Sequence, residues 1–176
     1  MTTQTQTHTG RIYVACLASY NAGILHGEWI EATADADELK ARVQDMLDRS
    51  PEPYAEEWAI HDFEGFGRVS EYEDLDHIAE RVECWEGLGQ EAVEAYVSNC
   101  GTWNKECFEE HYCGAIPAHQ EDKKKWCEDQ FMECCPLSGH EREFFETWCD
   151  WEKIAYCWEF GYTFVEYRNK YHIFSE

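Results

Sequence analysis

The chain of 176 residues carries 37 Asp and Glu against 14 Lys and Arg, so its formal net charge is −23. Nucleic-acid-binding proteins need a basic footprint, and proteins held to an anionic membrane need clusters of Lys and Arg, so the charge excludes both classes. Very acidic chains are often disordered, but 44% of these residues are hydrophobic and 15% are aromatic, which is enough apolar area for a core. The composition therefore predicts a folded protein under strong self-repulsion.

The beginning of the chain is polar. Residues 1–10 lack the apolar run of a secretory signal, and we expect them to form a flexible tail. No run of 18 apolar residues occurs in the sequence, which argues against a membrane-spanning helix. These features favour a cytoplasmic protein.

The first predicted domain is an α+β unit over residues 11–68. Strands are expected over 11–18 and 24–32, and a third strand over 57–63. A helix is expected between them over about 36–49. The apolar stripe of this helix consists of Leu39, Val43, Met46 and Leu47.

The middle of the chain has a helical period. A helix is expected from about residue 71, a second near 90–100 and a shorter one over about 104–113, which together form a helical middle domain over 69–114. The C-terminal α+β domain, 115–176, is predicted to contain helices near 119–135, 140–148 and 150–159 and a hairpin of strands 162–167 and 170–174. The predicted fold class is α+β, as an elongated chain of three small domains.

Ten cysteines occur without a C-x-x-C motif. Cys100 and Cys107 are seven apart, as are Cys127 and Cys134, and Cys149 and Cys157 are eight apart. These spacings would place each pair on one helical face, which favours reduced thiols in a core. The alternative is a metal-binding interaction protein. Its candidate ligands are Cys107, His111 and Cys113, with Cys134, Cys135 and His140 as further candidates.

The sequence lacks the motifs of common enzymes. It contains no Walker loop, no G-x-S-x-G, no G-x-G-x-x-G after a strand and no H-E-x-x-H. The acidic run 71–76 is not a calcium loop, because it lacks the central glycine and the final bidentate Glu. We expect no catalytic residue, no cofactor and no resident metal.

A row of carboxylates lies along one face of the first helix that is expected in the middle domain. Its members, Glu73, Asp76, Glu80 and Glu83, share one face and have no cation on that face. Like charges at these spacings destabilise a helix, so the row favours a role beyond solubility. Duplex DNA carries one negative charge per about 1.7 Å, so 23 charges correspond to roughly 40 Å of duplex, and mimicry of DNA is a third interpretation beside a solvated surface and a catalytic or metal site.

Several segments carry motifs that occur together in one protein family. The stretch Tyr20–Trp29 follows a strand beginning at Ile12 and contains a Y-N-A-G turn and then G-E-W, and 59–66 is a second motif. These two motifs resemble the opening and the second signature of the ArdA antirestriction family. Weaker similarities follow in the family's order over 108–114, 151–155 and 171–174.

The resemblance implies a bacterial cytoplasmic DNA mimic, encoded on mobile elements or phage, that occupies the DNA-binding groove of Type I restriction-modification enzymes. It also implies a homodimer formed through the C-terminal domain, with no catalytic activity and no cofactor. Gly23 is expected to form a turn, and Gly27 is expected to allow a close approach of neighbouring chain segments. Trp29, Ile60 and Phe63 are expected in the core, and His61 and Asp62 at structural or surface positions.

The candidate site is the acidic surface as a whole. The residues expected to contact the partner enzyme are Asp35, Glu38, Asp45, Asp48, Glu56, Glu71, Glu73, Asp74, Asp76, Glu80, Glu83, Glu91, Glu94, Glu109, Glu110, Glu128, Asp129 and Glu141.

Overall fold

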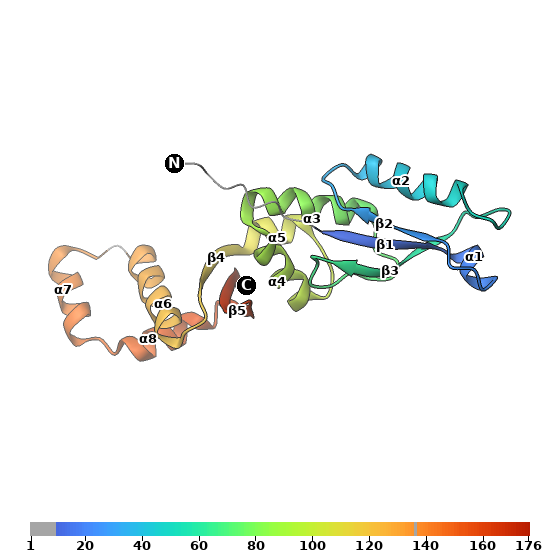
Figure 1. Ribbon diagram of the computed structural model, residues 1–176. Helices are drawn as coiled ribbons and strands as arrows, with labels where there is room; N and C mark the ends of the chain where they lie inside the picture. Colours follow the sequence, from blue (N-terminus) through green and yellow to red (C-terminus); the bar gives the residue numbers. More distant parts are fainter. Residues whose placement is uncertain (1–9, 136) are drawn as a thin grey trace, which may run out of the picture. The chain divides into compact units, whose positions relative to one another are not determined.

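The computed structural model describes residues 10–135 and 137–176 (Figure 1). The chain divides into two compact units, the first ending at Glu106 and the second spanning Cys107–Glu176. Each unit contains its own three-stranded antiparallel sheet with helices, so the predicted α+β class is confirmed. The division into three domains stays a prediction. The predicted tail, apart from Gly10, lies outside the described residues.

The sheet of the first unit has the order β2-β1-β3. Its strands are β1 (Arg11–Cys16), β2 (Gly27–Glu31) and β3 (Trp58–Glu64), and both outer strands run antiparallel to β1. The strand predicted over 11–18 ends earlier, because the short helix α1 (Leu17–Asn21) begins directly after Cys16. The strand predicted over 24–32 also begins later, at Gly27.

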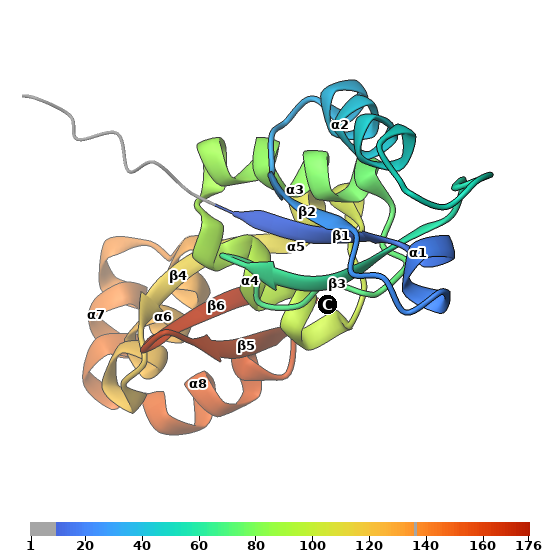
Figure 2. The same ribbon diagram turned by 45° about the vertical axis from the view of Figure 1, so that its right-hand side comes forward.

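Helix α2 (Ala36–Asp48) supplies one side of the core of this unit. Asp35 caps it by accepting hydrogen bonds from the backbone N–H groups of Asp37 and Glu38 at 3.0 and 3.1 Å. The predicted apolar stripe is confirmed, since Leu39, Val43, Met46 and Leu47 are all buried. Figures 1 and 2 show α2 lying over one face of the sheet, on the same side as α3.

Two further helices complete the first unit, α3 (Leu75–Leu88) and α4 (Gln90–Cys100). Asp74 begins α3 by accepting a hydrogen bond from the backbone N–H of Asp76, so this helix starts four residues later than predicted. Gly89 separates the two helices at φ +89°, a backbone conformation that favours glycine. Helix α3 packs on both α2 and α4.

The second unit contains helices α5 (Lys105–His111, which crosses the unit boundary), α6 (Gln120–Cys134), α7 (Gly139–Trp148) and α8 (Trp151–Glu159) and strands β4 (Tyr112–Pro117), β5 (Tyr162–Tyr167) and β6 (Lys170–Ser175). The sheet order is β4-β6-β5. The terminal hairpin is confirmed, with Arg168 and Asn169 at positive φ in its two-residue turn. Strand β4 was not predicted, because its first residues were assigned to the end of a short helix.

The ten cysteines are free, and most of them are not in a core. Only Cys16, Cys84 and Cys127 are buried among the ten free cysteines. Cys100 and Cys107 are exposed because a loop separates α4 from α5, so a spacing of seven does not place them on one helical face. Cys134 is exposed at the last residue of α6. The prediction of core thiols is therefore wrong for these three positions and for Cys157, which is also exposed.

Candidate functional site

The predicted acidic surface is exposed at most of its positions, on both units. The exposed members are Asp35, Glu38, Asp45, Asp48, Glu56, Glu71, Asp74, Glu83, Glu109, Glu110, Asp129 and Glu141. The half-buried members are Glu73, Asp76, Glu80, Glu91 and Glu128. In the first unit these acids lie on α2, α3 and α4 and in the segments before β3 and α3, and in the second unit they lie on α5, α6 and α7.

Glu94 does not belong to this surface. Its exposed fraction is 1%, and its side chain forms an ion pair with the equally buried Arg81. The Glu94 carboxylate also accepts hydrogen bonds from the backbone N–H of Gly67 at 2.6 Å and from the indole Nε1 of Trp85 at 3.2 Å. The Arg81 guanidinium lies 4.8 Å from the centre of the Phe66 ring. Glu94 thus joins α3, α4 and the loop after β3, and the prediction that it contacts a partner is wrong.

Three of the four carboxylates of the predicted row have partners outside α3. Asp76 accepts a hydrogen bond from Lys40 Nζ on α2 at 2.6 Å, and Glu83 lies 2.7 Å from Lys105 Nζ. Glu80 accepts a hydrogen bond from the indole Nε1 of Trp103 at 2.9 Å, and Glu73 precedes the helix, with Oε1 lying 3.1 Å from His77 Nδ1. The expectation that the row lacks cationic partners is therefore wrong for Asp76 and Glu83, since Lys40 and Lys105, which are distant in sequence, pair with them.

Ion pairing holds some of these carboxyls in the charged form. The hydrogen bond from Lys40 lowers the pKa of Asp76, and the same contact raises the pKa of Lys40. In the second unit, Glu141 accepts hydrogen bonds from the hydroxyl and backbone N–H of Ser138, in a capping box that lowers the pKa of Glu141. Both carboxylates remain ionised at neutral pH.

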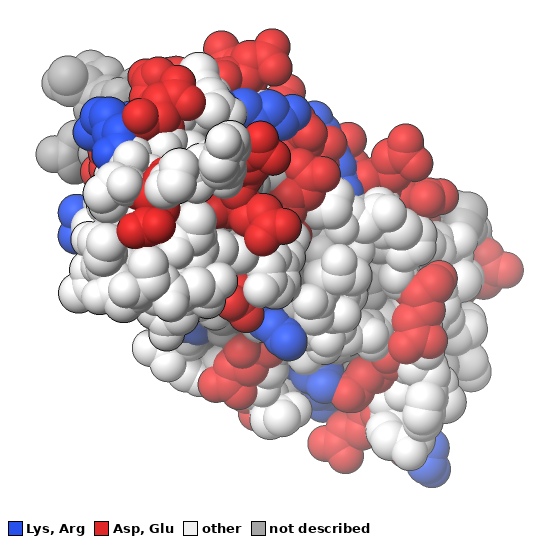
Figure 3. All heavy atoms as spheres, turned by 90° about the vertical axis from the view of Figure 1, so that its right-hand side faces the viewer, with Lys and Arg blue, Asp and Glu red and all other residues white. Residues whose placement is uncertain are grey.

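Acidic side chains stand in groups on the molecular surface. Figure 3 shows the face on the side where α1 lies in Figure 1, and Asp and Glu gather there in several clusters separated by uncharged residues and a few basic ones.

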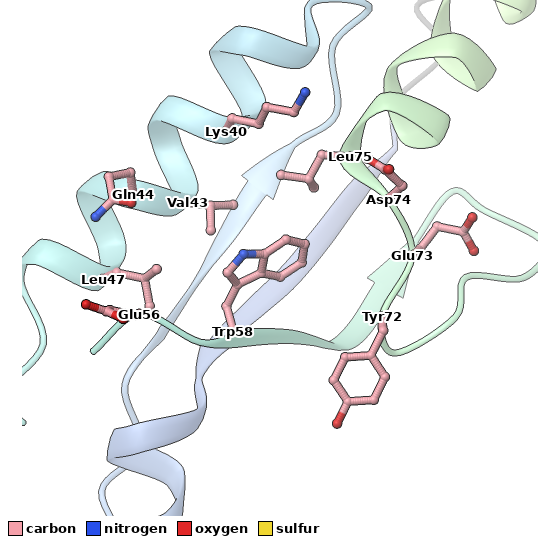
Figure 4. Close-up of a pocket in the computed structure, with 10 residues that line it drawn as sticks. All are labelled: Lys40, Val43, Gln44, Leu47, Glu56, Trp58, Tyr72, Glu73, Asp74 and Leu75. Carbon is pink, nitrogen blue, oxygen red and sulfur yellow. The ribbon is translucent and has the colours of Figure 1, made fainter. Parts of the chain in front are cut away.

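One of the hollows in the first unit is a groove of about 470 Å³ between α2, β3 and the turn before α3 (Figure 4). Its apolar residues are Val43, Leu47, Trp58 and Leu75, and its polar ones are Lys40, Gln44, Glu56, Tyr72, Glu73 and Asp74. In Figure 4 the Trp58 ring projects toward Val43 and Leu75, whereas the Tyr72 ring points away. The sequence predicted Trp58 only as part of a strand and did not predict this groove. The spacing of two between Glu56 and Trp58, which puts both side chains on one side of an extended segment, could have indicated it.

The motif residues that suggested a family mostly shape the fold. A Cβ at Gly27 would lie 2.6 Å from the backbone oxygen of Val14, so the predicted close approach is confirmed. Gly23 has φ +79° and forms the predicted turn. Ile60 is buried as expected. Trp29 and Phe63 are half-exposed, so their assignment to the core is wrong.

His61 and Asp62 are exposed, as the surface interpretation predicted. The His61 ring lies edge-on to Tyr20 at 4.9 Å, and Asp62 Oδ1 accepts a hydrogen bond from the backbone N–H of Phe63 at 2.8 Å. These contacts stabilise the strand and the neighbouring helix α1.

The candidate metal ligands do not meet. Within residues 10–135 and 137–176, no group of three or more His, Cys, Asp or Glu side chains is arranged to hold a metal ion. Cys113 Sγ instead donates to the backbone oxygen of His111 at 3.3 Å. The alternative of a metal-binding protein built on Cys107, His111, Cys113, Cys134, Cys135 and His140 is therefore not supported. Over the same described part of the chain, no helix is both long and apolar enough to cross a membrane.

Comparison with known proteins agrees with the motifs. A search of curated proteins finds no match. The sequence model of the family described as Antirestriction protein (ArdA) matches residues 12–172, which includes both units of the fold. With its family signatures, its α+β units and this match over nearly the whole chain, the protein belongs to the ArdA family of antirestriction proteins.

Proposed function

We propose that this protein inhibits Type I restriction-modification enzymes by occupying their DNA-binding groove with carboxylates in place of phosphates. Membership of the ArdA family implies antirestriction and interaction with restriction-modification enzymes, as an inhibitor and not as an enzyme. The mimicry of DNA goes further and rests on the charge of the chain. The Type I target is what the resemblance to the family implies.

The observation that carries the proposal is a surplus of carboxylates without internal partners. The chain has 37 acids and 14 Lys and Arg residues, and eight of those cations already form ion pairs with its own Asp and Glu. The cations of the chain therefore cannot neutralise its exposed acids. A basic groove shaped for DNA offers the missing countercharge, with a field that also accelerates association.

The acids of the first unit are held on rigid elements. Asp35 and Asp74 cap α2 and α3, and the Lys40–Asp76 ion pair links these two helices. A surface already ordered before binding avoids the entropy cost of arranging its charges on the target. This preorganisation supports a charge mimic more than a merely soluble surface.

A homodimer formed through the second unit is part of the proposal. Four large hydrophobic side chains of α7, α8 and the residue after α8 are more than half exposed: Phe144 at 59%, Trp148 at 75%, Tyr156 at 63% and Phe160 at 67%. Exposed aromatic side chains are enriched at protein interaction sites. Dimerisation would double the negative charge offered to a target. Action on such enzymes places the protein in the bacterial cytoplasm.

The test is competition with DNA on a Type I methyltransferase core. Labelled duplex carrying the recognition site is bound to the methyltransferase core, and the amount that the protein displaces is measured at several salt concentrations. We expect the inhibitor's affinity to fall at least about tenfold between roughly 50 and 200 mM NaCl, because many ion contacts are screened together. Affinity that does not change with salt, or binding that leaves the duplex in place, would overturn the mimicry.

A further inference from the structure

We propose that the groove between α2, β3 and the turn before α3 is an anchor site for an arginine side chain of the protein partner. This inference rests on the proposed function, since a DNA-binding groove is where such an arginine would be found. It goes beyond distributed charge, because it assigns one concave site with a defined occupant.

The groove combines an aromatic surface with carboxylates. Trp58 lies between Glu56 on one side and the Glu73–Asp74 turn on the other, with Val43 beside its ring (Figure 4). Glu73 and Asp74 already accept hydrogen bonds within the chain, from the backbone of Ser70 and Asp76. Over the residues that the structure describes, Glu56 has no ion pair and Trp58 has no cation on its ring.

One backbone hydrogen bond and one ion pair fix the segments that line the groove. The backbone N–H of Ile60 in β3 donates to the backbone oxygen of Glu71 at 2.8 Å, which fixes the turn before α3 against the strand. The Lys40–Asp76 ion pair ties α2 to the first turn of α3 across the same region. The site is therefore preformed, and its occupant meets little ordering cost.

The same chain fills similar arrangements with its own cations. Arg11 lies 4.7 Å from the centre of the Trp29 ring and 2.7 Å from Glu64. Two other trios have the same composition of cation, aromatic ring and glutamate: Arg81, Phe66 and Glu94, and Lys123, Phe164 and Glu159. Trp58 and Glu56 supply the ring and the glutamate of such a trio, and the cation is left to a partner.

Arginine fits this site better than other residues. Its planar guanidinium stacks on an indole ring and pairs with a carboxylate, and its aliphatic stem packs on apolar side chains such as Val43 and Leu47. Arginine is also abundant in surfaces that contact DNA phosphates and among the residues that dominate binding energy. A neutral side chain would leave Glu56 without a countercharge.

The first experiment does not need the target enzyme. The ¹⁵N-labelled protein is titrated with N-acetyl-arginine amide, and the indole N–H signal of Trp58 is assigned by its loss in Trp58→Phe. We expect this signal to shift with arginine amide, less with lysine amide and not with citrulline amide, which has nearly the same shape without the charge. Equal shifts with citrulline and arginine amides, or no shift with arginine amide, would overturn the site.

The second experiment measures binding to the Type I methyltransferase core. Glu57 is the matched control for Glu56, because neighbouring side chains of an extended segment point to opposite sides. We expect Glu56→Gln and Trp58→Leu to weaken binding by roughly three- to tenfold more than Glu57→Gln, the range of a partly desolvated cation–π contact. If Trp58→Leu loses its fold by circular dichroism, Glu56→Gln alone decides the result.

The two experiments separate this inference from the proposed function. If the wild-type protein fails to bind the methyltransferase core, the proposed function is wrong, and the amide titration still decides whether the groove accepts arginine. If the wild-type protein binds and Glu56→Gln binds as tightly as Glu57→Gln, the anchor site is wrong, and the proposed function stands.

Discussion

Lys40 on α2 donates a hydrogen bond to Asp76 on α3, with 2.6 Å between Nζ and Oδ1. The two residues are 36 positions apart, and their contact ties together the two helices that lie over the first sheet. It also neutralises one carboxylate of the α3 row and occupies the charge of Lys40, which lines the groove beside it. One ion pair thus affects both the packing and the charge pattern of the first unit.

Removal of this pair should change the titration of Asp76. In Lys40→Met, we expect the pKa of Asp76 to rise toward its ordinary value, since the hydrogen bond from Lys40 is the main cause that lowers it. A depressed folded-state pKa stabilises the fold above the unfolded pKa of about 3.9, and this stabilisation is lost as the pH falls through the folded value. Wild type and variant should therefore differ slightly in urea unfolding at pH 6 and converge in acid.

Carboxyl ¹³C chemical shifts measured against pH check this prediction directly. Arg142→Met is the control, because Arg142 is exposed on α7 in the other unit and should leave the titration of Asp76 unchanged. An Asp76 pKa that stays low in Lys40→Met would assign the shift to another contact.

The sequence predicted those elements whose structure depends mainly on their own residues. The stripe of α2 has a strict helical period, and its burial follows from that period alone. The terminal hairpin was identified because two strand-forming runs flank Arg168-Asn169. Strand β4 was missed because Tyr112–Pro117 becomes a strand by pairing with β6, more than 50 residues away in sequence. Neither propensity nor periodicity reports such a long-range pairing.

The candidate site was predictable in composition but not in detail. Charge alone indicated an acidic surface, and most of the predicted carboxylates are exposed. Glu94 looked like one more member, yet the fold places it against Arg81 in the core. The partners of Asp76 and Glu83 come from α2 and α5. Such contacts between distant residues exist only after the helices have packed.

Gly27 should be intolerant of substitution, although alanine is the smallest change. A Cβ at this position would meet the backbone oxygen of Val14 at 2.6 Å and the hydroxyl of Tyr13 at 2.7 Å. We expect Gly27→Ala to lower the free energy of unfolding by about 1–3 kcal/mol, as overpacking does. Gly87→Ala is the matched control, because nothing lies within 4 Å of a Cβ there and Gly87 is inside α3.

Gly87→Ala should instead raise the free energy of unfolding by about 0.5–1 kcal/mol, since alanine has the higher helix propensity. Urea unfolding followed by far-ultraviolet circular dichroism measures both variants. The same sign of change in the two variants would contradict the close approach at Gly27.

Glu94 should be important for stability and not for charge mimicry. Glu94→Gln keeps the shape of the side chain but leaves the buried guanidinium of Arg81 without its countercharge. We expect a loss of about 3–5 kcal/mol in the free energy of unfolding, the usual cost of breaking a buried ion pair on one side. Glu86→Gln, an exposed change of the same charge on α3, should stay within about 0.5 kcal/mol of wild type. Equal urea midpoints for the two variants would show that the pair does not hold α3 and α4 together.

The exposed carboxylates of α2 should act together in binding the target enzyme. Glu38, Asp45 and Asp48 are all exposed, and none of them lies in an ion pair among the described residues. Each exposed ion contact contributes at most about 1 kcal/mol, so Asp45→Asn alone should weaken binding to the methyltransferase core by about twofold. The triple variant Glu38→Gln, Asp45→Asn, Asp48→Asn should weaken binding by roughly tenfold. The difference should shrink at high salt, because screening removes the same contacts from the wild-type protein.

Titrations at two salt concentrations measure this difference in binding, and unchanged urea unfolding is the control for folding. A triple variant that binds like wild type at low salt would exclude α2 from the contact and shift the mimicry to other acidic groups.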